Sequence, residues 1–89
     1  MNTKLWVKIF KALGNEGRLK IMKLLFGCGE FTVTDISKEI GLSLKATSKH
    51  VIAMDNLGFV KNTGKKGHVY YSIDLSQHTK VKELLKMIF

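Results

Sequence analysis

The chain has 89 residues, and 15 Lys and Arg against 7 Asp and Glu give it a formal net charge of +8. This length suits one domain, and it excludes large enzyme architectures and a separate ligand-binding domain. Hydrophobic residues make up 45% of the chain, too many for a disordered protein and enough for one small core. We therefore expect a single domain over residues 1–89.

The cysteine content and the apolar runs narrow the class of protein further. The one cysteine, Cys28, excludes an intramolecular disulfide and predicts a reduced thiol packed as a small apolar group. No apolar run approaches the roughly 18 residues of a membrane span, and residues 1–10 lack the apolar block of a signal peptide. We expect a cytoplasmic protein with no membrane partner.

The basic residues are unevenly spread along the chain. Residues 1–26 hold six basic side chains and one acid, residues 27–42 hold one against three, and residues 43–68 hold five against one. A basic surplus interrupted by an acidic stretch indicates a face that binds a polyanion, because solubility alone needs no such clustering.

The first two elements read as helices. Apolar residues at i, i+3, i+4 and i+7 predict an amphipathic helix over 3–13. Gly14 would end it, and the Asn15 side chain can cap a second helix over 16–26. Apolar residues cover most of the circumference of that second helix, which marks it as a central, largely buried element.

A second pair of helices follows a short β-prone run. Residues 31–33 predict a strand, and Thr34 can cap a third helix that ends at Gly41. Ser43 can cap a fourth helix over 44–57. Two short helices joined by a tight turn that contains glycine form a helix-turn-helix.

The C-terminal part predicts a hairpin and a last helix. Residues 59–61 and 69–73 are β-prone, and residues 62–67 between them read as a hairpin loop rich in lysine and glycine. Ser76 can cap a helix over 77–89. The fold class is therefore mainly α with a small β-hairpin wing over 59–73, a winged helix-turn-helix in the order α-α-(β)-α-α-β-β-α.

The helix over 44–57 carries the features of a DNA-reading element. One face is suited to the core, while Lys45, Ser48, Lys49 and Ile52 share another at helical spacing. Short hydrogen-bonding and cationic groups on a helix suit the major groove of duplex DNA, and the wing would contact the backbone or the minor groove. The expected DNA-binding residues are Ser43, Leu44, Lys45, Ser48, Lys49, Lys65, Lys66 and His68.

The two terminal helices predict a homodimer. Each carries an apolar stripe, and together the stripes exceed what so small a core can cover, so pairing across a two-fold axis would bury them. We expect the helices over 3–13 and 77–89 to be the dimerisation elements. The expected interface residues are Trp6, Ile9, Phe10, Leu13, Val81, Leu84, Leu85 and Ile88.

The sequence gives less support to other classes of function. There is no P-loop, no metalloprotease histidine pair and no dinucleotide fingerprint, so we do not expect an enzyme. A winged helix that binds proteins within a larger assembly stays the alternative. The basic surplus over residues 43–68 favours DNA, since a protein-binding module has no need of it.

Four segments, taken in order, resemble the ArsR/SmtB family of winged-helix repressors. Residues 11–22 (KALGNEGRLKIM) are similar to its opening signature and residues 42–51 (LSLKATSKHV) to its recognition helix, including a Ser-x-His pair. Residues 56–60 (NLGFV) and 67–73 (GHVYYSI) match its helix end and wing. The resemblance spans nearly the whole chain and implies a dimeric DNA-binding repressor with its first and last helices in the dimer contact.

The sequence departs from the family at its metal sites. Metal-sensing members carry Cys-x-Cys early in the third helix, where this chain has Thr32 and Thr34, and a hydroxyl is a poor ligand for soft or borderline ions. The alternative site on the last helix would have only Asp74, His78 and Glu83, with one histidine where the family uses two. We expect no metal or other cofactor, and the sequence does not indicate an inducer or an operator.

Overall fold

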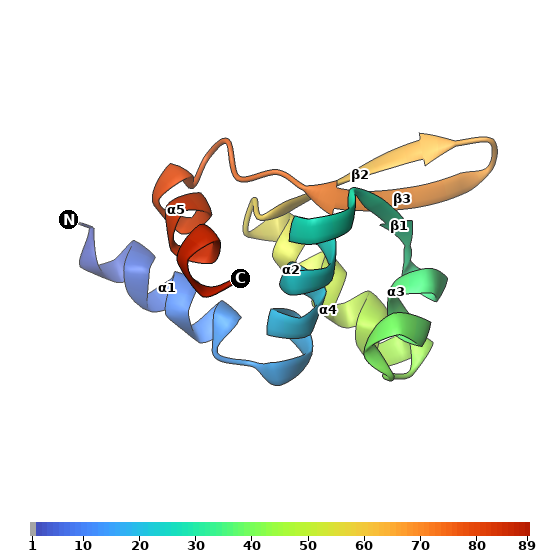
Figure 1. Cartoon of the computed structure of the whole chain (residues 1–89), viewed down its shortest axis with the longest axis horizontal. Helices are drawn as coiled ribbons and strands as arrows, with labels where there is room; N and C mark the ends of the chain where they lie inside the picture. Colours follow the sequence, from blue (N-terminus) through green and yellow to red (C-terminus); the bar gives the residue numbers. More distant parts are fainter. Residues whose placement is uncertain (1) are drawn as a thin grey trace.

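The computed structural model describes residues 2–89, apart from the side chain of Cys28, so the packing expected for that thiol lies outside the described part. Figure 1 shows the helices below a small sheet, in the order that the sequence predicts. The elements are α1 (Thr3–Leu13), α2 (Glu16–Cys28), β1 (Glu30–Thr32), α3 (Val33–Ile40), α4 (Leu44–Asn56), β2 (Val60–Lys65), β3 (His68–Ile73) and α5 (Thr79–Ile88).

Side-chain caps explain where four of the helices begin. The side chains of Asn2, Asn15, Thr32 and Ser43 each accept a hydrogen bond from the amide three residues further on, at 3.0–3.2 Å. Each bond satisfies an amide that the first turn of a helix leaves without a partner. The prediction that Thr34 caps the third helix was wrong: Thr32 has the extended backbone of a cap, and the helix has already begun at Val33.

The last helix also starts differently from the prediction. The Ser76 hydroxyl donates to the Asp74 carboxylate at 2.7 Å, so it does not cap a helix at residue 77. Instead α5 begins at Thr79, and the side chain of its N-cap residue, His78, makes no capping hydrogen bond. A short Asx-type turn, in which an aspartate holds the groups two residues on, has taken the place of the expected cap.

The three strands form one antiparallel sheet in the order β1-β3-β2. The β2–β3 ladder runs from Val60↔Ile73 to Lys65↔His68, so the loop is much shorter than the 62–67 predicted. Lys66 and Gly67 form the turn with φ of +50° and +80°. Two consecutive residues with positive φ allow a two-residue hairpin turn that matches the strand twist, which is why the strands extend further than the sequence pattern indicated.

One cluster of buried residues runs through the chain, with α2 at its centre. Ile21, Met22 and Leu25 of α2 are at most 2% exposed, which confirms the central position predicted for this helix. α2 extends two residues past the predicted end, to Cys28. The inward face of α4 packs against the same cluster, and so do Val60 and Tyr71 of the hairpin.

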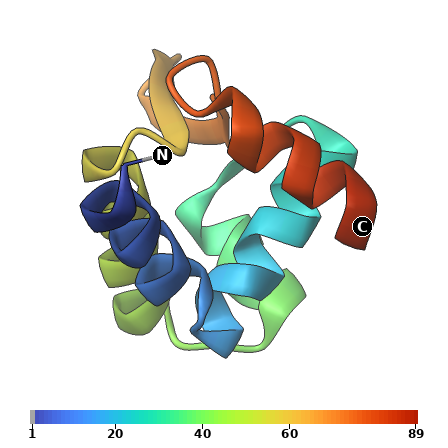
Figure 2. The same cartoon turned by 90° about the vertical axis from the view of Figure 1, so that its left-hand side faces the viewer.

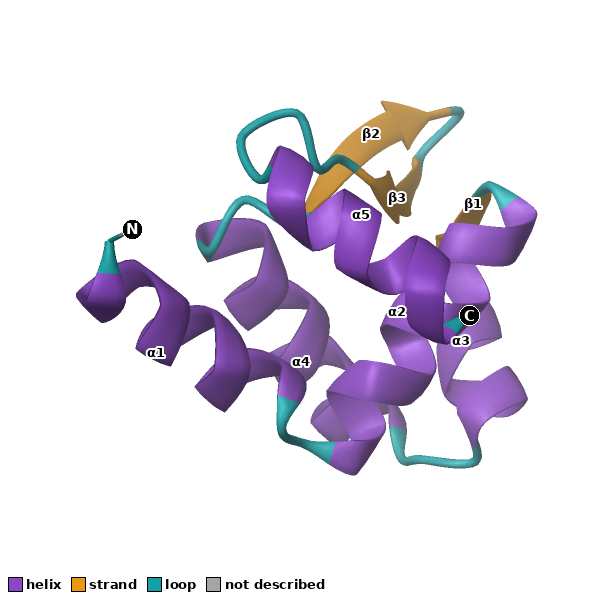
Figure 3. Ribbon diagram, turned by 60° about the vertical axis from the view of Figure 1, so that its left-hand side comes forward, coloured by secondary structure: helices purple, strands orange, loops and turns teal. Residues whose placement is uncertain are grey.

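The molecule is elongated, with extents of 40 × 23 × 22 Å. α1 and α5 occupy one end, where they face the viewer in Figure 2, while α3 and the tip of the β2–β3 hairpin lie at the other end. Figure 3 shows the sheet at one side of the helices. Among the described residues no helix is both long and apolar enough to cross a membrane.

One buried polar atom in the core leads to a prediction about stability. Thr47 on α4 is 0% exposed, and its hydroxyl has no hydrogen-bond partner in the described part of the chain. Because a buried hydroxyl without a partner costs about 1–3 kcal/mol, we predict that Thr47→Val raises the free energy of unfolding by ~1 kcal/mol. Urea unfolding followed by circular dichroism measures this change.

Val51, one turn away and equally buried, provides the reciprocal control. Val51→Thr makes the same exchange of a methyl for a hydroxyl in the opposite direction, and it should lower the free energy of unfolding by roughly 1–3 kcal/mol. A loss of stability in Thr47→Val would contradict the prediction and show that this hydroxyl is hydrogen-bonded in solution.

Candidate nucleic-acid interface

α4 presents the face that the sequence predicts. Ser43 caps it, with its hydroxyl accepting from the Ala46 amide at 3.1 Å. Thr47, Val51 and Met54 point into the core and are 0% exposed. The opposite face carries Lys45 and Lys49, which are exposed, the half-buried Ser48, and Ile52, which is 51% exposed.

The wing ends in a cationic tip, but its two lysines differ. Lys66 lies in the turn and is exposed. Lys65 pairs with the Glu30 carboxylate of β1, and its ammonium nitrogen lies 5.9 Å from the centre of the Tyr70 ring. The hydrogen bond and the charge of Glu30 raise the pKa of Lys65. A phosphate would therefore compete with Glu30 for Lys65, while Lys66 has no ion pair in the described part of the chain.

An open hollow joins three elements at this end of the molecule. It is lined by the start of α3, the first turns of α4 and the wing tip. Three of the predicted DNA-binding residues, Leu44, Ser48 and His68, meet there although they are up to 24 positions apart in the sequence. The lysines lie outside the hollow, and the Ser43 hydroxyl is engaged in its cap.

Part of this surface was not predicted from the sequence. Thr32, Val33 and Thr34 at the start of α3 line the hollow beside Ser48, and Val69 lines it from the wing. Nothing in their own spacing indicates a site, since only the packing of α3 beside α4 brings them to the wing. The first helix of the helix-turn-helix therefore contributes to the same surface as the second.

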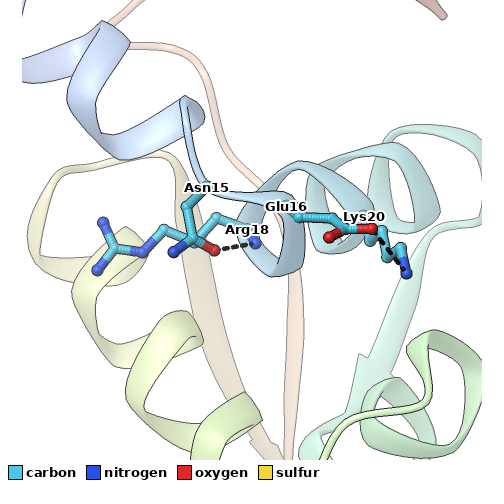
Figure 4. Close-up of polar contacts among 4 residues, drawn as sticks. All are labelled: Asn15, Glu16, Arg18 and Lys20. Atoms are coloured by element: carbon cyan, nitrogen blue, oxygen red, sulfur yellow. Dashed lines mark hydrogen bonds and ion pairs between the residues drawn. The ribbon is translucent and has the colours of Figure 1, made fainter.

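A contact from α2 holds α4 in place. The Arg18 Nε donates to the His50 Nδ1 at 3.2 Å. Figure 4 shows Arg18 extended away from Lys20, which pairs at 3.5 Å with Glu16 on the same helix, and shows the Asn15 cap at the start of α2. A Cβ on Gly17 would lie 2.9 Å from Leu42 Cδ1 and 3.1 Å from His50 Nε2, so a glycine allows the close approach of α2 to α4.

Comparisons with known proteins agree with this architecture. The family model described as "Bacterial regulatory protein, arsR family" matches residues 15–62, more than half of the chain. The chain belongs to the ArsR family. It is thus a winged-helix transcriptional regulator rather than an enzyme, as the sequence analysis expected.

Individual proteins similar to this chain agree with that assignment. The chain is 38% identical over 82 residues to a cadmium resistance transcriptional regulatory protein CadC homolog of Staphylococcus aureus, covering 92% of this chain and 65% of that protein. Reduced HlyU from Vibrio cholerae is 28% identical over 99% of this chain and 92% of that chain, with a TM-score of 0.82. The homodimeric winged helix-turn-helix DNA-binding domain of Mb0332 from Mycobacterium bovis is 27% identical over 96% and 78%, with a TM-score of 0.79.

The terminal helices of this ArsR-family chain divide the predicted interface residues into two groups. Ile9, Leu13, Val81 and Leu85 are at most 8% exposed and belong to the core of the chain itself, so they offer little surface to a second copy, and their place in a dimer contact stays a prediction. Each terminal helix turns one side inward, and these residues lie on that side. Phe10 and Ile88 are 58% and 53% exposed, and Trp6 and Leu84 are half-buried.

Two of the three residues considered for a metal site near the last helix, Asp74 and His78, have other partners. Asp74 accepts hydrogen bonds from the amide and the hydroxyl of Ser76, which lower the pKa of its carboxyl group. The His78 Nε2 lies 2.9 Å from the Leu57 carbonyl oxygen. Among the described side chains, which do not include that of Cys28, no three His, Asp or Glu residues form a group that could hold a metal ion.

The Arg18–His50 contact predicts how stability depends on pH. Burial, and then the charge of Arg18, lower the pKa of His50 below the usual histidine value of 6.5, and His50 accepts this hydrogen bond only when neutral. The unfolded chain thus binds the proton more readily than the folded one. We expect the contribution of His50 to be fully present above pH 6.5 and to be lost as the pH falls below it.

Urea unfolding at pH 7.5, 6.0 and 5.0 measures this loss. In His50→Gln, which keeps an acceptor for Arg18 without titrating, stability should fall less between pH 7.5 and 5.0. His68→Gln, at the exposed wing tip, is the matched control and should follow the parent protein. Equal pH profiles for the parent protein and His50→Gln would disprove the assignment.

Proposed function

We propose that this protein is a dimeric, sequence-specific DNA-binding repressor that reads the major groove with α4 and contacts the backbone or minor groove with the wing. One observation carries the proposal: the exposed face of α4 and the wing tip border one hollow at the end of the molecule away from the terminal helices. A helix and a hairpin side by side suit the neighbouring grooves and backbones of one duplex.

The chemistry of each position supports a distinct role. Ser48 can donate to or accept from a base edge, and Leu44, 54% exposed, is an apolar partner for the methyl group of thymine. Lys45 and Lys49 are exposed cations on the same helix and suit phosphate oxygens. Lys66 and His68 would contact the backbone at the wing. Ser43 is the weakest candidate, because its hydroxyl is occupied by the cap.

The relatives support DNA and a second copy of the chain as partners. The Mycobacterium bovis neighbour is a homodimeric DNA-binding domain, and the Staphylococcus aureus relative is a transcriptional regulatory protein. A dimer bound across a promoter represses it by excluding the polymerase, which requires no further activity. The chain spans about two thirds of the staphylococcal relative, so what that whole protein does is not carried over.

The charge of α4 predicts the salt dependence of DNA binding. Each phosphate neutralised by a lysine releases condensed counterions, so log K falls with log salt with a slope of about −0.9 per contact. The double variant Lys45→Gln/Lys49→Gln should bind duplex DNA more weakly, and the magnitude of that negative slope should decrease by between about 1 and 2. Fluorescence anisotropy with a labelled duplex at several salt concentrations measures both quantities.

The matched control removes the same charge elsewhere. Lys20 and Lys23 lie on α2 beside Glu39, away from the hollow, and Lys20→Gln/Lys23→Gln should keep the slope of the parent protein. A salt-independent interaction, or equal losses in both double variants, would contradict the role of α4. Absence of any DNA binding would instead favour a protein-binding module.

The exposed apolar residues of α1 and α5 predict dimerisation. Leu5, Val7, Phe10, Met87, Ile88 and Phe89 are between 38% and 83% exposed on these elements and at the chain end. Burying them against a second copy would remove an apolar surface that monomers seldom expose. An isologous contact would also place two α4 helices for successive major grooves about 34 Å apart.

Sedimentation at micromolar concentration tests the dimer. The parent protein should sediment at about twice 10.0 kDa, and Phe10→Glu or Ile88→Glu should sediment at 10.0 kDa and bind a symmetric DNA site more weakly. Ile52→Glu changes a residue of similar exposure, 51%, on α4 and should stay dimeric. Leu85 is unsuitable, since a glutamate at this fully buried position would unfold the chain. A parent protein of 10.0 kDa would disprove the dimer.

A further inference from the structure

The sheet carries an ion pair that spans all three strands. β3 lies between β1 and β2. Glu30 of β1 is opposite Ser72 of β3, and Lys65 of β2, next to the turn, is opposite His68. Because alternate residues of a strand share a face, Glu30, Tyr70 and Lys65 project from the same face of the sheet. Lys65 therefore reaches across β3, over the Tyr70 ring, to pair with Glu30.

This pair directs the Lys65 ammonium away from the tip of the wing. Figure 1 shows β1 beside the half of the hairpin nearer the helices, with the turn at the far end. Gly67 and His68 line the hollow at the tip, and neither Glu30 nor Lys65 does. Lys66, in contrast, lies in the turn itself, is exposed and has no ion pair in the described part of the chain. The two neighbouring lysines are therefore unequally placed to meet a phosphate.

The exposure of the pair sets the size of its effect on DNA binding. The side chains of Lys65 and Glu30 are 54% and 38% exposed, and an ion pair this open to water is weak. A phosphate can therefore displace Glu30 from Lys65. Displacement breaks one ion pair to make another, so Lys65 adds less to the affinity than a lysine without a partner.

We propose that Glu30 limits the affinity of this protein for duplex DNA by holding Lys65, so that Lys66 is the lysine through which the wing neutralises phosphate. This role depends on the DNA binding proposed above, and it belongs to a residue of β1, outside both α4 and the wing. Removing the Glu30 carboxylate should free a second lysine of the wing for the DNA backbone.

The two lysines of the wing provide the first test, because they carry the same charge and differ in their partners. Fluorescence anisotropy with a labelled duplex at constant salt measures the affinity of each variant. Lys66→Gln should weaken binding by about threefold, as expected for one exposed ionic contact. Lys65→Gln, with the same net charge, should weaken it by under about 1.5-fold, because most of what it removes is the pair with Glu30.

A double-mutant cycle tests whether Glu30 acts through Lys65. Glu30→Gln should tighten binding by about threefold in the parent protein and in Lys66→Gln, but by less than about 1.5-fold in Lys65→Gln. In the parent protein it should also increase the magnitude of the negative salt slope by about 0.9, since one more lysine can neutralise a phosphate. Glu16→Gln, which removes the same charge and frees Lys20 on α2, is the matched control and should change binding by less than about 1.5-fold.

Three results would overturn this role of Glu30. An unchanged affinity in Glu30→Gln would show that the pair does not restrain binding. An equal gain from Glu30→Gln in Lys65→Gln and Lys66→Gln would show that the carboxylate only repels phosphates. Equal losses in Lys65→Gln and Lys66→Gln would show that Lys65 is not held back. Any of these in a parent protein that binds duplex DNA contradicts the role of Glu30 alone, whereas a parent protein without DNA binding contradicts the proposed function as well.

Discussion

The packing of α4 against α2 is the contact on which the other features of the molecule depend. Val51 and Met54 are wholly buried, and Gly17 lets α2 come close enough for Arg18 to bond His50. Because residues three and four apart share a face of a helix, burying one side of α4 determines which side chains remain in solvent. The same contact that stabilises the core therefore orients the lysines and Ser48 outward.

Periodicity predicted the helices well, since an apolar stripe must face a core wherever that core lies. The boundaries of α1 matched fully, and Ser43 and Asn15 cap as expected. The errors lie where several local choices compete. Thr32 and Thr34 are equally good caps by residue type, and Ser76 had a nearer partner in Asp74. Which of two possible residues caps a helix depends on the backbone conformation at each position, and the spacing of residues in the sequence does not reveal that conformation.

The candidate site was predictable in its centre and less so at its margins. Lys45, Ser48 and Lys49 follow from one helix, so spacing alone places them together. The contribution of Val33 and Val69 depends on how α3 and the wing approach α4, which is a tertiary property. The burial of Ile9 and Leu85 has the same origin: an apolar stripe looks alike in sequence whether it covers its own core or a partner. Only the path of the chain distinguishes these cases.

Two histidines hold α4 at different points along its length. His50 bonds Arg18 near the middle, and His78 reaches the carbonyl of Leu57, the residue that ends the helix, from the start of α5. A rotation of α4 about its own axis would break both bonds. The two bonds therefore fix the orientation of the outward face of α4 relative to the rest of the chain. If two copies bind one duplex, the fit to DNA must then be adjusted by changing the distance between the two copies, each moving as a rigid body. Rotation of α4 within one copy would not contribute.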